Sequence, residues 1–345
     1  MRSSFISSLS FYNAPRAALP KLQTELAKAS LELTTGRRAD PGLDLGVGIG
    51  ENVTLRRDQT SLKSLIDGNA STSAVLDRTQ TALDDIRGQA SDFLQSLVGL
   101  SQADGASSML AGQGRSAIDA LSATLNLTDG RRYLFGGLNS GTKPMAGLDE
   151  GPEAAIASDF TSRFGFDLAD PQVKNIPAAD LSDFIDTTLA SYFEQPGWGA
   201  TWSEASTNNR SAAISSTSRI DVGATANEPA MRKLAMAYTV VAMFGSAALE
   251  GDAQTAVLDK TRKLVGDAIG GVVDISTRLG AAQNRIAAAN TLMQGAFDAS
   301  DRRIAVLESV DPAAAKTRLD TITTQIEMSY SLTSRILKMS IMDYV

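Results

Sequence analysis

The stretch that decides the fold runs from Leu62 to Leu100 and reads LKSLIDGNASTSAVLDRTQTALDDIRGQASDFLQSLVGL. Its apolar residues recur at alternating steps of three and four, a spacing that aligns side chains along one narrow face of a helix. Nine of the twelve positions are apolar; all twelve are Leu62, Leu65, Asn69, Thr72, Leu76, Thr79, Leu83, Ile86, Ala90, Phe93, Leu97 and Leu100. The pattern predicts a long rod, an element typical of proteins that assemble rather than of catalytic domains.

A second stretch, far along the chain, has the same rhythm. Nine of its thirteen positions are apolar; the thirteen are Val265, Ile269, Val272, Ser276, Leu279, Gln283, Ile286, Asn290, Met293, Phe297, Ser300, Ile304 and Leu307. An apolar helix face needs a partner, and a chain that goes out and returns can pair two helices antiparallel. We therefore predict a rod core that contains Leu76, Leu83, Ile86, Phe93, Leu279, Ile286, Met293 and Phe297.

Three polar residues, Asn69, Gln283 and Asn290, interrupt these two apolar faces. They are either polar residues tolerated near solvent, or residues that fix the register of the two helices, as a buried Asn does in coiled coils. The sequence leaves both interpretations open.

The prolines mark the boundaries of the helices. None of the ten lies between residues 42 and 143 or between 230 and 311. An interior proline costs a helix about 3 kcal/mol, so the two gaps are where long helices belong. We predict rods at about 54–100, roughly 70 Å long if continuous, and at 253–309, with Gly270-Gly271 as a weak point, and shorter helices at 109–127 and 230–249.

Both ends of the chain also carry helical patterns. Residues 19–35 predict a short helix with Pro20 in its first turn and Gly36 as its C-cap. Asp311-Pro312 predicts the start of a final helix that runs to the C-terminus. The apolar positions of these two helices form a candidate assembly interface: Leu19, Leu22, Leu26, Leu33, Leu319, Ile322, Ile326, Tyr330, Ile336, Leu337 and Ile341.

The middle of the chain has a different composition. Residues 144–230 hold six of the ten prolines, both tryptophans, and thirteen acidic against four basic residues. A short helix is predicted from Asp180 to Phe193, and a strand is suggested within Ile214–Val222. The acidic, loop-rich composition favours an outward-facing domain without which the helices on either side could still fold.

Together these patterns predict a mainly α fold: a long antiparallel helical rod with an inserted small α+β domain. Three regions follow. Residues 1–40 with 310–345 form a terminal helical assembly region, residues 41–143 with 228–309 form a helical-bundle rod core, and residues 144–227 form the inserted outer domain.

Composition removes many kinds of function. The chain has neither cysteine nor histidine, which excludes disulfides, thiolate chemistry and any Ser-His-Asp triad. A net charge of −7 argues against nucleic acid as a partner. No apolar run is long enough to predict a membrane span, and the N-terminus lacks the apolar core of a cleaved signal peptide.

Three motifs suggest chemistry only weakly. Gly46–Gly50 lacks the full spacing of a dinucleotide loop, and Gly136–Lys143 places its lysine wrongly for a phosphate-binding loop. Asp180, Asp183 and Asp186 fit a solvated acidic helix face better than a cation site. We therefore predict no catalytic, cofactor-binding or metal-binding residues, and no cofactor.

Several segments resemble a known family. Met1–Ser7 and Leu33-Thr34-Thr35-Gly36-Arg37 resemble the N-terminal region of the flagellin superfamily. Gly130–Ser140, which reads GRRYLFGGLNS, is similar to a segment of its hook-associated protein 3 branch, the hook–filament junction proteins. Leu319–Ile336 and Met339–Val345 are similar to the C-terminus of that branch, with Val345 where leucine is usual. The opening has Pro15 and Pro20 instead of many Asn and Ala residues, which favours a junction protein over a filament subunit.

The resemblance implies a non-enzymatic structural protein of the bacterial flagellum. Such a protein is exported unfolded by the flagellar type III apparatus with a chaperone, without a cleaved signal peptide, and is extracellular. It self-assembles into a ring that joins the hook, through the other junction protein, to the flagellin filament needed for motility. Two alternatives remain: a flagellin filament subunit, and a helical scaffold like a type III needle-tip protein, against which Tyr133–Gly136 speaks.

Overall fold

The computed structural model describes residues 8–100, 106–245, 247, 249 and 251–342. Its helices are α1 (Ser8–Thr35), α2 (Pro41–Asp44), α3 (Ile49–Leu100), α4 (Ala106–Leu125), α5 (Pro152–Phe164), α6 (Ala178–Phe184), α7 (Gly197–Thr201), α8 (Pro229–Phe244), α9 (Gly251–Glu308) and α10 (Pro312–Met342). Its strands are β1 (Ser211–Ala213) and β2 (Arg219–Asp221). The expectation of a mainly α rod with a small inserted α+β segment is confirmed. The motif Met1–Ser7 and the end of the C-terminal motif, 343–345, lie outside the described residues.

Contacts divide the chain into two units. One comprises Met1–Ser64 with Met293–Val345, and the other comprises Leu65–Leu292. Both α3 and α9 contribute to each unit. The three regions expected from the sequence follow roles in assembly rather than contact density, and their boundaries stay a prediction.

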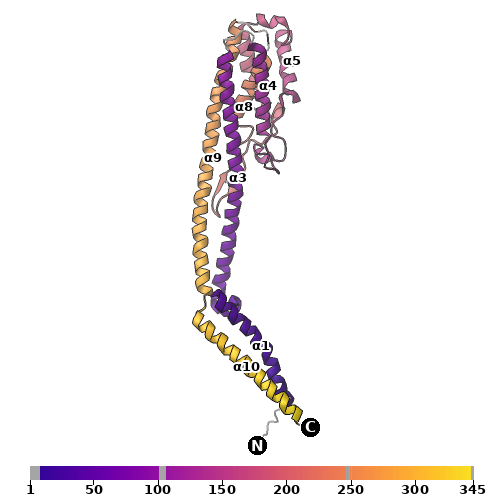
Figure 1. Cartoon of the computed structure of the whole chain (residues 1–345). Helices are drawn as coiled ribbons and strands as arrows, with labels where there is room; N and C mark the ends of the chain where they lie inside the picture. Colours follow the sequence, from indigo (N-terminus) through magenta and orange to yellow (C-terminus); the bar gives the residue numbers. More distant parts are fainter. Residues whose placement is uncertain (1–7, 101–105, 246, 248, 250, 343–345) are drawn as a thin grey trace. The chain divides into compact units, whose positions relative to one another are not determined.

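In the second unit the two rods lie side by side and run antiparallel (Figure 1). The Nε2 of Gln80 on α3 donates to the carbonyl of Ser276 on α9 at 2.8 Å, and the Nε2 of Gln283 on α9 lies 2.6 Å from Oδ1 of Asp77 on α3. The residue numbers of α3 rise along the seam as those of α9 fall, so the two helices run antiparallel. The helix α9 continues through Gly270-Gly271. Gly271 allows α9 to approach α8 closely here, since a Cβ on Gly271 would lie 2.9 Å from the Cβ of Ala230.

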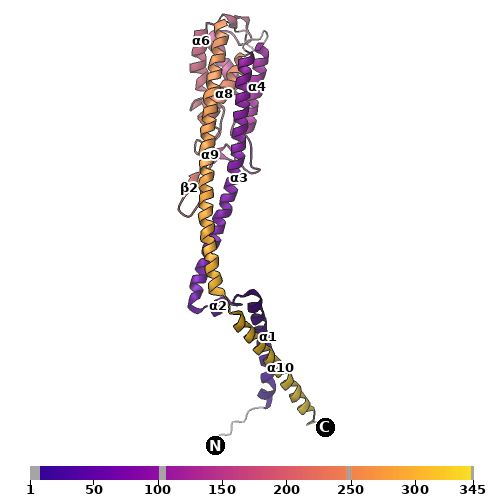
Figure 2. The same ribbon diagram turned by 60° about the vertical axis from the view of Figure 1, so that its left-hand side comes forward.

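The helix α8 forms the centre of the same unit and is buried along most of its length. It packs against α4, and Figure 2 shows the two beside the rods. Gly114 permits this packing, since a Cβ there would clash with the backbone nitrogen of Ala242. The ring of Tyr238 on α8 meets Phe93 on α3 edge-on, with centroids 4.8 Å apart. The helices and the rods therefore share one core.

The inserted segment shares this core as well. Phe160 on α5 lies 5.6 Å from Phe184 on α6 and 5.8 Å from Phe244 on α8, measured between ring centroids. All three rings are almost fully buried. Residues 144–227 thus cover apolar surface of α8, which burial stabilises in proportion to the area removed from water.

Local structure differs from expectation in several places. The helix predicted at 230–249 is α8, which ends at Phe244. The helix α1 begins at Ser8 and not at residue 19, so Pro15 and Pro20 lie inside it, where each loses a backbone hydrogen bond and crowds the carbonyl four residues earlier. The strand suggested within 214–222 is β2. It pairs antiparallel with β1 to form a hairpin, and the Ser/Thr-rich stretch 214–218 forms the turn between them. The helix at 180–193 is α6 followed by a π-helical turn, Ile185–Leu189.

Candidate assembly interface

The terminal helices α1 and α10 pair with each other within the first unit, and both views show them side by side (Figures 1 and 2). Ala29, Ala315 and Ile322 are buried between them. The sequence-predicted residues Leu19, Leu22, Leu26, Leu33, Leu319 and Ile326 are half-buried along the same line. The structure therefore brings most of the predicted interface residues together, and the side chains of Ile336, Leu337 and Ile341 lie outside the described residues.

Each helix of the pair covers only one face of the other. The remaining faces of α1 and α10 carry apolar side chains that are exposed to solvent. Leu31, Met328, Tyr330 and Leu332 are each about half exposed, from 46% to 59%. Tyr330, a predicted assembly-interface residue, is one of these exposed side chains, and its role in assembly stays a prediction. A hollow of about 580 Å³ lies on the pair, lined by Ala18, Lys21, Leu22, Gln325, Met328, Ser329 and Leu332. Exposed apolar surface of this kind typically marks an interaction site.

A buried carboxylate ties α1 to α10. Glu32 on α1 is only 4% exposed. Its Oε2 lies 3.2 Å from Nη1 of Arg318 on α10, and its Oε1 accepts the backbone N–H of Ala39 at 3.2 Å. Because a buried charge must be compensated, this pairing fixes where α10 lies along α1.

A second buried carboxylate, Glu308 at the end of α9, joins the terminal pair to the base of the rods within the first unit. Glu308 is 2% exposed. It accepts hydrogen bonds from Nδ2 of Asn52 at 2.8 Å and from the guanidinium of Arg56, both on α3. Nη1 of Arg37, just after α1, lies 3.7 Å from its other oxygen. One side chain therefore contacts α3, α9 and the segment that follows α1.

Backbone hydrogen bonds also connect the segment after α1 to the end of α9, beside Glu308. The N–H of Arg38 donates to the carbonyl of Glu308 at 2.8 Å, and the N–H of Val310 donates to the carbonyl of Gly36 at 3.0 Å. Gly36 has a φ of +66°, a conformation that suits glycine, and its own N–H caps α1 on Glu32. This confirms Gly36 as the C-cap. The Thr-Thr-Gly turn therefore ends α1 and connects it by hydrogen bonds to the segment after α9. We call Arg37, Asn52, Arg56 and Glu308, with these backbone bonds, the joint.

Burial and hydrogen bonding act in opposite directions on Glu308. Burial by itself raises the pKa of a carboxyl group. The hydrogen bonds from Arg56 and Asn52, with the charges of Arg56 and Arg37, outweigh it and hold the pKa of Glu308 below its ordinary value. The carboxylate is therefore ionised and its charge stabilises the joint.

The predicted rod-core residues lie inside the helical layers. Leu76, Leu83, Ile86, Phe93, Leu279, Ile286 and Met293 are at most 6% exposed, and Phe297 is half-buried. Asn69, which the sequence left with two interpretations, is 1% exposed and donates to Oδ1 of Asn290 at 2.7 Å. Its second hydrogen bond, of 3.0 Å, goes to the carbonyl of Ile214 in the hairpin. This geometry favours the register interpretation over polar residues merely tolerated near solvent.

Sequence reasoning missed Glu32, Asn52 and Glu308. No signal in the sequence distinguishes them. Asp77, Asp84 and Arg87 also directly follow buried seam residues and are exposed, so a charge next to an apolar position does not predict burial.

The three motifs that suggested cofactor, phosphate or cation binding only weakly form ordinary structural contacts. Nζ of Lys143 pairs with Oε1 of Glu150 at 2.7 Å, and Asp183 pairs with Arg163 at 2.9 Å. Gly46–Gly48 forms a short 3₁₀ turn before α3. Within the described residues no three Asp or Glu side chains gather as metal ligands would.

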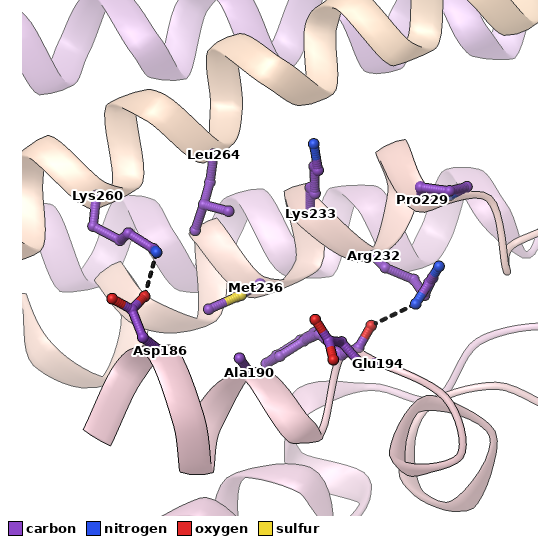
Figure 3. Close-up of a pocket in the computed structure, with 10 residues that line it drawn as sticks. Asp186, Ala190, Glu194, Pro229, Arg232, Lys233, Met236, Lys260 and Leu264 are labelled. Atoms are coloured by element: carbon purple, nitrogen blue, oxygen red, sulfur yellow. Dashed lines mark hydrogen bonds and ion pairs between the residues drawn. The ribbon is translucent and has the colours of Figure 1, made fainter. Parts of the chain in front are cut away.

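A separate hollow of about 280 Å³ lies between α8, α9 and the segment 186–194 (Figure 3). Its floor is apolar, with Phe193, Met236 and Leu264. The charges around it already have partners: Lys260 pairs with Asp186, and Nη1 of Arg232 donates to the carbonyl of Phe193 at 3.0 Å. These contacts tie the inserted segment to α8 and α9.

Comparison with known proteins identifies the ends of the chain. Residues 6–140 match the model of the bacterial flagellin N-terminal helical region, and residues 263–345 match that of the bacterial flagellin C-terminal helical region. No curated protein matches the sequence significantly. Among solved structures, a protein from Vibrio parahaemolyticus described as flagellar hook-associated has a similar fold, with a TM-score of 0.51 and 11% identity over 74% of this chain and 94% of that one.

The fold and these matches together define a class of structural protein that is built from long helices, with its first and last helices, α1 and α10, paired. The chain belongs to the flagellin superfamily and is a structural component of the bacterial flagellum. Among the described helices, none is both long and apolar enough to cross a membrane.

Proposed function

We propose that this chain is a hook–filament junction protein that forms a ring between the hook and the filament. The observation that carries the proposal is the terminal pair: α1 and α10 bury one seam between them and leave Leu31, Met328 and Leu332 exposed. Residues 6–140 and 263–345, which include this pair, match the flagellin helical regions. A bundle of neighbouring copies would cover this exposed apolar surface.

Two observations favour the junction over a filament subunit. The solved structure with a similar fold is described as flagellar hook-associated, and this chain covers 94% of its length. The first helix also contains Pro15 and Pro20, where a flagellin opening is rich in Asn and Ala. The ring would contact the other junction protein on one side and flagellin on the other, outside the cell, after export with a chaperone through the flagellar type III apparatus.

A filament subunit is the second candidate, since both matching models are flagellin regions. The two roles predict different contacts. Head-to-tail contacts between identical copies repeat into an open filament, whereas a contact made with an unlike partner ends there.

A deletion strain separates the two roles. Without a junction protein, filament subunits are still synthesised and exported but have no base, so we expect hooks without filaments and flagellin free in the medium. Without the filament subunit itself, hooks are also bare but the medium contains no flagellin. Negative-stain microscopy with a flagellin immunoblot reads both outcomes. Normal filaments in the strain would contradict either role.

A further inference from the structure

The second unit contains a hollow of about 540 Å³ between α3, the turn after α4 and the hairpin. Ser71 and Val75 line it from α3, Arg131 and Arg132 from the turn, and Arg210 from the start of the hairpin. Arg78 extends from the same face of α3, because residues 71, 75 and 78 are spaced at i, i+4 and i+7. Its Nη1 lies 3.5 Å from the carbonyl of Asp129, which belongs to the same turn. Three arginines therefore line one hollow, and a fourth, Arg78 on α3, lies beside it; we call this hollow the arginine hollow.

These guanidinium groups are poorly compensated. In the part of the chain that the structure describes, the side chains of Arg131, Arg132 and Arg210 form no hydrogen bond and no ion pair. Some arginines elsewhere are paired, as Arg163 is with Asp183 and Arg278 with Glu228, whereas exposed Arg285 and Arg302 have no ion pair in the described residues either. What distinguishes Arg131, Arg132 and Arg210 is that all three line one hollow, so that a single anionic partner from outside the chain can contact them together.

One carboxylate lines the hollow, and it is already engaged. Oδ1 of Asp129 accepts the backbone N–H groups of Arg131 and Arg132 at 2.9 and 2.8 Å. These two bonds, with the charges of Arg210 and Arg78, lower the pKa of Asp129. The geometry agrees, because Arg210 and Asp129 line the same hollow and Nη1 of Arg78 lies 3.5 Å from the carbonyl of Asp129. A single Asp leaves a surplus of positive charge facing the hollow.

The chain also carries the complementary surface. Residues 144–230 hold thirteen acidic and four basic residues. Asp167, Asp180 and Glu204 in this segment are exposed and form no ion pair in the described part of the chain. They do not fill the arginine hollow of their own chain, so they remain available to another copy.

We propose that the arginine hollow binds carboxylate side chains from the acidic segment, residues 144–227, of a second copy of this chain. A planar guanidinium matches a carboxylate in a two-point contact, and the three that line the hollow can hold more than one acidic side chain. The inference rests on assembly of the chain with itself, a property of the flagellin superfamily, and not on the junction role.

The first test measures self-association of the full chain by sedimentation velocity across a salt series. We compare the wild type with Arg131→Gln/Arg132→Gln/Arg210→Gln, which removes charge and keeps size. We expect association to weaken about tenfold and its salt dependence to flatten. The control, Arg57→Gln/Arg285→Gln/Arg302→Gln, removes three exposed arginines that line no common hollow, of which Arg57 pairs with Asp58 and the other two are unpaired in the described residues, and it should change association less than about twofold. Circular dichroism confirms that both variants fold.

The second test identifies the occupant. A photo-crosslinking residue replaces Thr72 or Ser211 beside the hollow, in a mixture of isotopically light and heavy chains. We expect crosslinks from one copy to residues 144–227 of the other, and we expect an octaglutamate peptide, but not inorganic phosphate at equal ionic strength, to abolish them. Crosslinks within one chain, crosslinks to another region, equal competition by phosphate, or a wild type that does not associate would each overturn the proposal. The deletion strain decides the junction role separately, so the two failures are distinguishable.

Discussion

The side-chain amide of Asn69 on α3 donates a 2.7 Å hydrogen bond to Oδ1 of Asn290 on α9, inside the seam between the two rods. The pair fixes one register, because a shift of either helix would leave polar groups buried without partners. The second bond from Asn69, to the carbonyl of Ile214, attaches the hairpin to the same point.

Asn69→Ala should lower the free energy of unfolding by about 1–3 kcal/mol, because Asn290 and the Ile214 carbonyl lose a buried donor. Oδ1 of Asn69 is itself buried without a partner in the described part of the chain, so its removal offsets part of that loss. Gln283→Ala is the matched control: it removes another bond between α9 and α3, to Asp77, but at the exposed edge, and should cost less than about 0.5 kcal/mol. Urea unfolding followed by circular dichroism measures both. Equal effects would mean that burial does not distinguish the two pairs.

The joint should depend on pH through Glu308. Its pKa is lowered in the folded chain from an ordinary value of 4.5, so the charged form stabilises the fold. That stabilisation is complete above the pKa of the unfolded chain and is lost as pH falls through the lower, folded pKa. Glu308→Gln should therefore speed hydrogen exchange at the amides of Arg38 and Val310 relative to the wild type at neutral pH, and the difference should close in acid.

Exchange rates corrected for intrinsic pH dependence test this prediction by mass spectrometry or nuclear magnetic resonance. Glu25→Gln provides the control, since this carboxylate is 54% exposed and makes only a 4.0 Å pair with Lys28. Its substitution should leave both amides unchanged at every pH. An effect of Glu308→Gln that is the same at neutral and acid pH would show that shape, and not charge, holds the joint.

The seam between the rods predicts a large effect of a single buried charge. Ile286→Asp places a carboxylate at a position that is 1% exposed, and it should lower stability by more than about 3 kcal/mol. Ala288→Asp introduces the same charge on the exposed side of α9, two residues away, and should cost less than about 0.5 kcal/mol. Thermal unfolding measures both variants. A melting temperature of Ile286→Asp equal to that of the wild type would show that the seam is open to water.

The rods were predictable because apolar residues recur every three or four positions along a continuous stretch of sequence. Leu76, Leu83 and Ile86 are buried where the spacing placed them. The joint was not predictable in this way, since Arg56 and Glu308 are 252 residues apart and neither belongs to a pattern of its own. The hairpin was missed for a related reason: its turn is held by a backbone bond from Ile214 to Ser218 and by the Ser215 hydroxyl, which accepts from the N–H of Ser218, and an apolar–polar alternation reveals neither.

The inserted segment shows how packing limits composition-based reasoning. Its acidic residues and prolines suggest a separate outer domain, and its surface fits that view. Its aromatic rings, however, pack on Phe244 of α8, so its apolar residues belong to the common core. A deletion of residues 147–226 would therefore expose apolar surface of α8 as well as remove the segment.

The terminal helices should be the least stable part of an isolated chain. Between them α1 and α10 bury Ala29, Ala315 and Ile322, whereas α8 is buried along most of its length. Opening free energies follow such differences in burial, so amides of α1 and α10 should exchange much faster than those of α8 in a dilute monomer. In the assembled state neighbouring copies would cover Met328 and Leu332, and exchange at both ends should then slow at least tenfold while that of α8 stays constant. Exchange mass spectrometry on monomer and assembly measures this directly, and strong protection of both ends in the dilute monomer would contradict it.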